Sequence, residues 1–481
     1  MTVVTAGAAW PSLDPANPTI IPQEADEDPA VEPLFYTSAK GQIVPFLASK
    51  YSVSADGLTI TIDLRKGINF QDGTPFNAQA VVDNLERYAS PAVNSECVTY
   101  LSVMQSATAT DPYTVTVKLS EKDASFMPVL ASQQCSFMVS PTAVAKEGAS
   151  FGQHPVGTGA YTFVSGTTGV VAKYQHWPGY WQKGKGYLDN ITVENVGSNQ
   201  DALHALQAGT AQVWTGITSG DAAAQVAQAK GASNLNVMSA PAAQINYVAL
   251  NFTQPPFNNL TARQALLYAT NQSQITSKLY QGAYKPVQGV FPPFLWTYSD
   301  KVKGYPTYNL NKAKDLVKQL GGISFTLSVN NTPGWLAEAE ALQNQWAQAG
   351  IKVTIDPLDA PHLISRLHAL SYQGLLIVSP ALTDPDMITY RWFYSKSKLT
   401  QGGLKDSQAD QLILSGRQTY SQGERKPKYS ELNDLLGGQQ VVWDNVFSQT
   451  YFQVQSSKVQ GYPANPTAYV PWAEMSMSNQ S

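Results

Sequence analysis

Residues Leu58–Tyr88 read LTITIDLRKGINFQDGTPFNAQAVVDNLERY, and within this stretch the hydrophobic periodicity changes twice. The first part alternates apolar and polar residues, which predicts a half-buried strand with an apolar face at Leu58, Ile60, Ile62 and Leu64. Gly67 then predicts a turn, because glycine is favoured in tight turns. The apolar residues Ile68 and Phe70 predict that the chain returns as a hairpin.

A second turn and a helix follow the predicted hairpin. Asp72-Gly73 predicts a tight turn, and Thr74-Pro75 favours extended backbone after it. Asn77 is suited to cap a helix, because its side chain can accept a hydrogen bond from the first turn. That helix would carry an apolar face formed by Val81, Leu85 and Tyr88. By itself, the pattern describes an ordinary hairpin-and-helix unit.

Taken whole, the stretch resembles the most recognisable segment of the family 5 extracellular solute-binding proteins, the peptide/nickel-type receptors of ATP-binding-cassette importers. The resemblance covers nearly the whole chain and includes the segments Ala9–Pro15, Val31–Lys50, His154–Tyr161, Trp177–Trp181 and Asn199–Val213. It implies an α/β fold, a periplasmic-binding-protein-like clamshell (type II, cluster C-like) with an additional bracing domain. The two main lobes are expected to close over a solute.

The resemblance also implies boundaries for three domains. Domain I is expected to comprise residues 1–38, 154–246 and a C-terminal tail, 456–481. Domain II is expected to comprise residues 39–153, and domain III residues 247–455. The length agrees with several domains, because 481 residues exceed what one hydrophobic core usually serves.

The composition points to no strongly charged partner. The chain has 31 Lys and Arg against 35 Asp and Glu, so its net charge of −4 does not favour nucleic acid or an anionic membrane. Uncharged polar residues are abundant, and 24 Tyr and 10 Trp provide many aromatic side chains. Because no run of about 18 apolar residues occurs, we expect no membrane-spanning helix.

The N-terminal sequence MTVVTAGAAW lacks a basic region followed by an apolar core, so we interpret it as mature sequence with an added start Met. The resemblance implies an extracytoplasmic location, in the periplasm or on the outer face of the cytoplasmic membrane, with a lipid anchor on the full-length precursor. The two cysteines, Cys97 and Cys135, are either unrelated buried thiols or a disulfide. For an exported protein we favour the disulfide.

The glycines of His154–Tyr161 invite a phosphate-binding interpretation. This interpretation fails, because no Lys-Ser/Thr pair follows Gly157 and Gly159 to open a helix. We expect these glycines to shape a tight crossover turn instead.

Other motifs that suggest catalysis lack the surroundings that catalysis requires. Gly148–Gly152 has the spacing of a nucleophile elbow around Ser150, but a predicted helix, Pro141–Lys146, precedes it where an elbow needs a strand.

The five histidines show no paired metal-binding spacing, so we expect no cofactor and no protein-built metal site. Nickel receptors of the family bind a chelated metal, and that possibility stays open. Asp384 and Asp386 are too close in sequence for a glycosidase pair, and we favour turn and cap formation for them.

The segment Leu375–Phe393, LLIVSPALTDPDMITYRWF, bears on the class of solute. In the family's peptide receptors the corresponding strand carries a Trp and, after a short gap, an Asp that would pair with a peptide's α-ammonium. Counting back from Asp384 places Ala381 at the Asp position and Val378 at the Trp position. An unpaired buried ammonium costs several kcal/mol, so this difference argues against strict recognition of free N-termini. A shift of one or two residues would let Asp384 or Asp386 bind the ammonium instead.

The resemblance suggests further solute contacts, most of them aromatic: Trp10, Trp214, Tyr247, Trp296, Asn330, Asn331, Trp335, His362 and Trp392. Trp10 follows the first strand and is equally well interpreted as a hydrophobic plug under its loop. Trp214 is expected on a loop after its strand, and His362 on a loop before a helix. We expect two to four of the Trp to be stacking platforms for the solute.

These observations predict a receptor, not an enzyme. It would capture peptides or peptide-like solutes by lobe closure and deliver them to the membrane permease subunits of an importer. We expect it to act as a monomer. An alternative in the same class is a receptor for oligosaccharides or small aromatic compounds, which the Trp content and Ala381 favour. A distant alternative is a secreted hydrolase that uses Ser150 or the pair Asp384 and Asp386.

Overall fold

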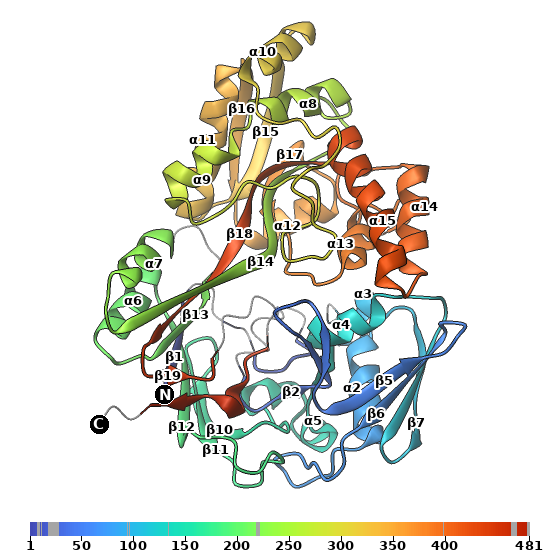
Figure 1. The fold of residues 1–481 in the computed structure, drawn as a ribbon, viewed down its shortest axis with the longest axis vertical. Coiled ribbons are helices and arrows are strands. Elements are labelled where there is room, and N and C mark those ends of the chain that lie inside the picture. The colour runs from blue at the N-terminus through green and yellow to red at the C-terminus, as the bar shows by residue number, and fades with distance from the viewer. Residues whose placement is uncertain are drawn as a thin grey trace. The chain divides into compact units, whose positions relative to one another are not determined.

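The computed structural model describes residues 1–6, 10, 12–17, 28–93, 95, 97–132, 134–217, 222–397, 399–462 and 469–478. The chain divides into two compact units, whose elements are labelled in Figure 1. Unit 1 comprises Met1–Ile217, Gln225–Ala240 and Tyr451–Ser481, and unit 2 comprises Thr218–Ala224 and Pro241–Thr450. The finer division into three domains stays a prediction.

The first sheet of unit 1 is built around the N-terminal strand. Its strand order is β10 (Tyr161–Thr167), β11 (Val171–His176), β12 (Asn190–Val196), β1 (Thr2–Ala6) and β13 (Val213–Ile217). β1 runs parallel to both β12 and β13, whereas β10 and β11 form an antiparallel edge. The helices α6 (Asn199–Gln207) and α7 (Ala223–Lys230) follow β12 and β13 along the chain. Ala9 and Pro11, in the segment Ala9–Pro15, lie outside the described residues.

A second, antiparallel sheet of unit 1 contains the strand predicted at Leu58–Leu64. Its order is β5 (Ala48–Val53), β6 (Thr59–Leu64), β8 (Thr114–Leu119) and β7 (Met104–Asp111). The apolar residues of β6 are buried and alternate with half-buried polar ones, which confirms the predicted strand. The predicted hairpin partner is wrong, because β6 pairs with β5 and β8.

Residues 65–76 form a compact turn where the hairpin was expected. Ile68 and Phe70 are buried, but their backbone belongs to no strand. The Phe70 N–H donates to the Thr74 carbonyl at 2.8 Å, and Gly73 has a φ of +85°, a value that glycine adopts without strain. The predicted turn at Asp72-Gly73 is therefore confirmed, and the two apolar side chains insert into the core without forming a strand.

The helix predicted after this turn is α2 (Ala78–Ala89). Asn77 caps it by accepting a hydrogen bond from the Ala80 N–H at 3.0 Å, as predicted. The buried face includes Val81, Leu85 and Tyr88, and the Tyr88 hydroxyl donates to the Phe137 carbonyl at 2.6 Å.

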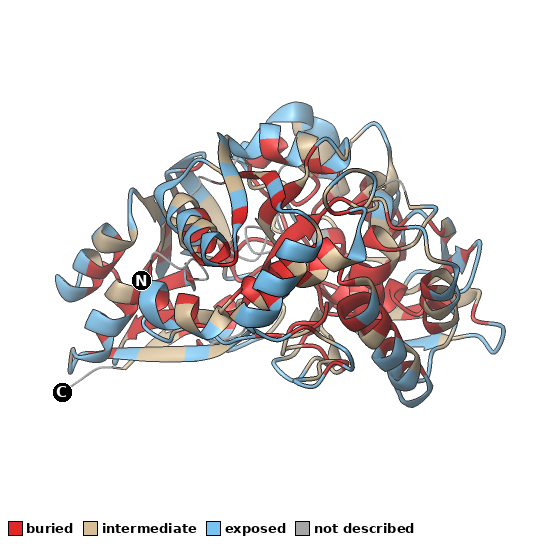
Figure 2. Cartoon of the chain, turned by 90° about the horizontal axis from the view of Figure 1, so that it is seen from above, coloured by how far each residue is buried: buried red, intermediate tan, exposed pale blue. Residues whose placement is uncertain are grey.

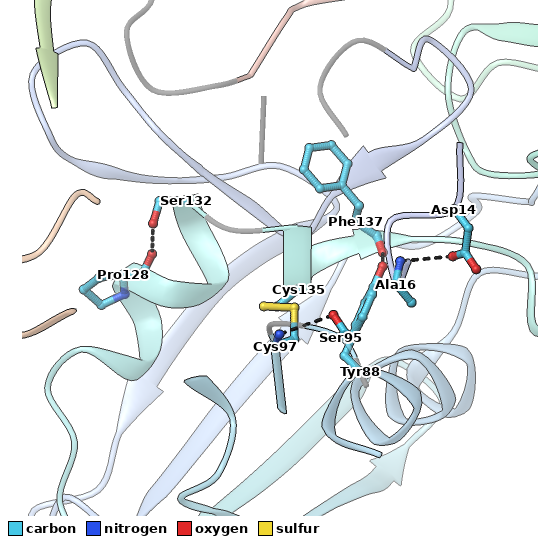
Figure 3. Close-up of a disulfide and its surroundings, with 9 residues drawn as sticks. All are labelled: Asp14, Ala16, Tyr88, Ser95, Cys97, Pro128, Ser132, Cys135 and Phe137. Carbon is cyan, nitrogen blue, oxygen red and sulfur yellow. Dashed lines mark hydrogen bonds between the residues drawn. A yellow bond between two sulfur atoms is a disulfide. The ribbon is translucent and has the colours of Figure 1, made fainter. Parts of the chain in front are cut away.

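Short elements surround α2 in unit 1. The helices are α3 (Cys97–Tyr100), α4 (Phe126–Ser132) and α5 (Pro141–Glu147), and the strands are β2 (Glu32–Pro33), β3 (Phe35–Thr37), β4 (Ile43–Pro45) and β9 (Phe137–Met138). Cys97 and Cys135 form a disulfide with a Cα–Cα distance of 5.6 Å, which connects the start of α3 to the segment after α4 (Figure 3). The bond closes a loop of 38 residues around part of this unit.

The glycine turn and the aromatic motif of unit 1 meet at one buried carboxyl group, that of Glu32. It accepts hydrogen bonds from Thr158 Oγ1 at 2.9 Å, the Tyr180 hydroxyl at 2.7 Å and Trp181 Nε1 at 2.8 Å. A Cβ atom added to Gly159 would lie 2.2 Å from the Pro29 carbonyl oxygen. This glycine therefore permits a close backbone approach, which confirms the structural interpretation of the turn.

Unit 2 contains a mixed sheet. Its strands, in order, are β14 (Leu235–Leu250), β17 (Gly374–Val378), β15 (Ile323–Asn330) and β16 (Ile351–Leu358). β15 is parallel to β16 and β17, and β17 is antiparallel to β14. The two long strands β14 and β18 (Trp443–Ser456) carry the chain between the units.

The helices of unit 2 are α8 (Leu260–Ala269), α9 (Gln272–Tyr280), α10 (Leu310–Gln319), α11 (Pro333–Gln348), α12 (Ala360–His368), α13 (Pro385–Trp392), α14 (Ser407–Arg417) and α15 (Gln422–Asn433), followed by a π-helical segment, Asp434–Gln440. Figure 2 shows that many helices of the chain have a buried face and an exposed one. Trp346 of α11 is fully buried, as its helical spacing predicts. The chain ends in unit 1 with β19 (Val459–Gln460), a 3-10 turn (Trp472–Glu474) and β20 (Ser476–Met477).

Candidate functional site

The carboxyl ends of the parallel strands of unit 2 gather several predicted contact residues. Asn330 ends β15 and is followed by Asn331, and Trp335 lies in the first turn of α11. His362 follows β16, and Ala381 follows β17. Because β15 is parallel to both β16 and β17, these residues follow the same edge of the sheet. In open α/β sheets this edge is where ligands bind.

The side chains at this edge differ in their exposure and in the hydrogen bonds that they already make. Asn330 Oδ1 accepts a hydrogen bond from the Thr332 N–H at 3.0 Å, so it helps to start α11. Asn331 is exposed and Trp335 is half-buried. His362 lies within the first turn of α12 and not on the loop before it, which corrects the prediction, because Asp359 caps this helix one turn earlier than expected. His362 Nδ1 lies 2.7 Å from Asp359 Oδ1.

The two carboxylates of the Asp-Pro-Asp turn are buried in ion pairs. Asp384 caps α13 and accepts two hydrogen bonds from Arg425, at 2.8 Å from Nη1 and 2.6 Å from Nη2. Asp386 pairs with Arg417 of α14. The cap formation that the sequence favours is therefore present. In this arrangement neither carboxylate is open to an ammonium group of a solute, and their role as solute contacts stays a prediction.

Aromatic rings enclose these ion pairs. Trp296 lies 5.4 Å from the Arg425 guanidinium, and Tyr390 lies 3.9 Å from that of Arg417, as measured to the ring centroids. Burial works against the charge of Arg425, but the charge and hydrogen bonds of Asp384 raise its pKa above the usual value. Burial, together with the charge of Asp386, raises the pKa of Tyr429. The ion pairs and rings form a buried, charged cluster at the start of α13.

Sequence reasoning missed Arg417, Arg425 and Tyr429 in this cluster. A usable signal was present, because the strand Gly374–Val378 is apolar and a turn with two carboxylates follows it directly. Buried carboxylates require cationic partners, so arginines elsewhere in unit 2 were to be expected. The sequence does not show which arginines approach the turn, because the contacts span 31 residues for Asp386 and 41 for Asp384.

Tyr247 and Trp392 come together through a residue that the sequence left unassigned, Trp443. The ring of Tyr247 stacks on Trp443 with centroids 3.8 Å apart, and Trp392 packs edge-on to Trp443 at 5.7 Å. Gln401 Oε1 accepts hydrogen bonds from the Tyr247 hydroxyl at 2.9 Å and from Trp443 Nε1 at 3.2 Å. Burial raises the pKa of Tyr247. These aromatic residues form a packed cluster around a shared amide.

The predicted contacts of unit 1 are buried. Trp10 follows β1 and packs in the hydrophobic core with Val3 and Tyr161, while its Nε1 donor has no hydrogen-bond partner among the described residues. Trp214 is within β13, paired with Val4 of β1 and Val454 of β18. The predicted loop position of Trp214 is therefore wrong, because the strand runs from Val213 to Ile217 and so continues past Trp214.

The described residues contain no group of three or more His, Cys, Asp or Glu side chains placed to hold a metal ion. Within the same ranges, no helix has both the length and the apolar composition that crossing a bilayer requires. Ser150 lies in a 3-10 segment after α5, and its hydroxyl donates to the Glu147 carbonyl at 2.8 Å. A strand-to-helix elbow is therefore not formed around this serine.

Solved structures define the class of fold. A periplasmic binding protein, DppA from Helicobacter pylori in complex with the peptide STSA, matches 100% of this chain and 98% of its own with a TM-score of 0.85 and 23% identity. NikA from Staphylococcus aureus in complex with Ni(L-His)2 matches 99% of each chain with a TM-score of 0.82 and 20% identity. The fold is thus that of the periplasmic binding proteins, and the predicted α/β fold class is confirmed.

Sequence comparison identifies the family. The model of the bacterial extracellular solute-binding proteins, family 5 (middle region), matches residues 42–400. The glutathione-binding protein GsiB of Escherichia coli O1:K1 / APEC is 36% identical over 364 residues, which are 74% of this chain and 69% of that protein. The chain belongs to the bacterial extracellular solute-binding proteins, family 5. The predicted role as a solute-binding receptor of an ATP-binding-cassette importer is thereby confirmed.

Proposed function

We propose that this receptor captures glutathione, or a short peptide similar to it, and releases it unchanged to its permease. The observation that carries this proposal is the 36% identity to a glutathione-binding protein over 364 residues. This identity exceeds the 20–23% identity to the peptide and nickel-chelate binding proteins named above.

The charged groups of unit 2 support a solute whose ammonium group does not bind a free carboxylate of the protein. By the resemblance to the peptide receptors, Ala381 stands at the position of the ammonium-binding Asp, and both oxygens of Asp384 are engaged by Arg425. Glutathione carries two carboxylates and one ammonium, so donors that bind carboxylates count for more in its recognition than in that of a simple dipeptide. Uncharged donors such as the exposed Asn331 suit carboxylate and peptide carbonyl groups.

The same proposal includes the location of the receptor and states that the receptor does not chemically convert its solute. The family is extracellular, and we propose the periplasm or a lipid-anchored position on the outer face of the cytoplasmic membrane for this member. The disulfide between Cys97 and Cys135 suits an oxidising compartment. The backbone-bonded hydroxyl of Ser150 supports a receptor that performs no hydrolysis.

A thermal-shift screen tests the proposal. The purified chain is heated alone and with reduced glutathione, dipeptides, longer peptides, oligosaccharides, small aromatic acids or nickel-histidine. A solute at 100 times its Kd stabilises the folded state by about 2.7 kcal/mol, which is readable as a rise in melting temperature. We expect glutathione to give the largest shift. A shift with sugars or aromatic acids and none with glutathione or peptides would overturn the proposal in favour of the alternative solute class.

A further inference from the structure

Unit 2 contains a cavity of about 350 Å³ between the end of α8, the start of α9 and the loop before α10. Its floor includes two buried residues, Thr270 and Asp444. Its rim includes the exposed side chains of Asp300 and Tyr308. The cavity lies wholly within unit 2, and its lining includes none of the residues predicted to contact the transported solute.

The floor presents hydrogen-bond acceptors that lack donors. Thr270 Oγ1 lies 2.6 Å from Asp444 Oδ2, and no described residue donates to the other carboxyl oxygen of Asp444. The Tyr305 hydroxyl and Asn445 Oδ1 are both buried, and neither has a hydrogen-bond partner of acceptable geometry among the described residues. Asp444 lies near Tyr305, and the side chains of Asn445 and Gln272 lie within reach of the Tyr305 hydroxyl. Buried polar atoms are normally satisfied, so the unpaired carboxyl oxygen of Asp444 calls for an external partner.

The charge of the lining favours a cation. Asp444 and Asp300 line the cavity, and none of the described lining residues is a Lys, Arg or His. The rings of Tyr298, Tyr305 and Tyr308 provide surfaces that attract organic cations. The N-terminus of α9 also borders the cavity, but it carries only about half a positive charge and Asn271 already caps it. The negative charge of the two carboxylates is larger than this partial positive charge.

We propose that this cavity is a second binding site, and that its ligand is a small primary amine. A primary ammonium group has three N–H donors, two of which can bind the unpaired carboxyl oxygen of Asp444 and the Tyr305 hydroxyl, because both residues line the cavity. The cavity volume is at the lower end of the range for small-molecule sites, so an amine with a short aliphatic chain fits. A second ammonium group at the other end of the chain would meet Asp300 at the rim.

The state of Asp444 gives the site a dependence on pH. Burial raises the pKa of Asp444 to about 7, and the groups that face it are Thr270 and Tyr305, neither of which is charged. The ammonium group binds the ionised carboxylate, so amine affinity should rise between about pH 6 and pH 8. Tyr305 remains protonated over this range, because burial and the charge of Asp444 raise its pKa.

Calorimetric titration of the full chain with butylamine and with 1,4-diaminobutane tests the proposal. At pH 8 and millimolar concentrations both amines should bind, the diamine more tightly. Asp444→Asn should weaken binding on the order of thirtyfold or more, because it removes the charged partner of the ammonium group. Tyr305→Phe, which removes only one hydroxyl, should weaken it several-fold and serves as a second test if Asp444→Asn folds poorly. Asp300→Asn should affect the diamine alone.

Glu338→Gln is the matched control, since Glu338 is a buried carboxyl group of unit 2 that does not line the cavity. It should leave amine binding unchanged. Failure of wild-type protein to bind either amine would overturn the proposal. Unchanged affinity in both Asp444→Asn and Tyr305→Phe would do the same, because any binding would then occur elsewhere.

Discussion

The ion pair between Asp384 and Arg425 places two full charges inside unit 2, where both side chains are almost completely buried. Such a pair adds little net stability compared with apolar residues, because both charges lose their hydration. Removing only one partner is far more costly, since the other charge is left buried without compensation. The pair therefore fixes the start of α13 in one position and excludes other positions of this helix end.

Arg425→Leu tests this role. The change leaves Asp384 buried and unpaired, so the free energy of unfolding should fall by about 3–5 kcal/mol, as measured by denaturant titration with tryptophan fluorescence. The matched control is Lys50→Ala, which removes the exposed cation that pairs with the half-buried Asp63 and should cost no more than about 1 kcal/mol. Equal effects of the two changes would contradict the proposed role of the buried pair.

Glu338 makes stability depend on pH. Its carboxyl group accepts hydrogen bonds from Tyr280 at 2.8 Å and from Asn246 at 3.2 Å, and burial raises its pKa from 4.5 to about 7. Between these two values the folded chain binds a proton that the unfolded chain has released. The contribution of Glu338 to stability is therefore lost as pH rises from about 4.5 to 7.

Glu338→Gln keeps the shape of the side chain and removes its titration. The unfolding free energy of the variant should fall less steeply than that of wild type between pH 5 and pH 8, with the larger difference at the higher pH. Glu340→Gln changes an exposed carboxylate of the same helix and should reproduce the wild-type slope. Parallel profiles for wild type and Glu338→Gln would show that Glu338 does not titrate in this range.

At the scale of elements, the crossover turn at Gly157–Gly159 holds together segments that are distant in sequence. Gln71 Nε2, from the turn before α2, donates to the Gly159 and Tyr161 carbonyls at 2.9 Å. The opposite side of the turn packs against the backbone of Pro29 and Ala30. This turn therefore joins the two sheets of unit 1.

Gly159→Ala should destabilise unit 1. The new Cβ would lie 2.2 Å from the Pro29 carbonyl oxygen and 2.7 Å from the Ala30 carbonyl carbon, so the backbone must shift at a cost of about 1–3 kcal/mol. Gly423→Ala is the control, because its nearest neighbour would be Ser421 Oγ at 3.8 Å. A melting temperature for Gly159→Ala equal to that of Gly423→Ala would contradict the argument.

Local sequence patterns predicted helices and strands better than they predicted which strands pair with one another. The alternation of Ile60, Ile62 and Leu64 specifies a strand, and the cap at Asn77 specifies the start of a helix, because both signals act within a few residues. The pairing of β6 was mispredicted as a local hairpin. Its actual partners are β5, which precedes it, and β8, which begins at Thr114, and no residue of the quoted stretch indicates a strand as distant as β8.

At the scale of the whole molecule, the fold class and the receptor role were predictable because the resemblance extends over most of the chain. The partners of individual side chains were not predictable in the same way. Trp443 packs with Tyr247 and Trp392, but the sequence left it unassigned, and only the structure shows that it begins β18. Side-chain partners depend on packing between distant segments, which periodicity does not encode.

Calorimetric titration of the purified chain with reduced glutathione, followed by mass spectrometry of the recovered solute, tests the central claim most directly. We predict saturable binding of one glutathione per chain and recovery of the tripeptide intact, because a receptor binds without turnover. Absence of binding would show that this member of the family serves another solute. Recovery of cleaved glutathione would contradict the receptor function itself.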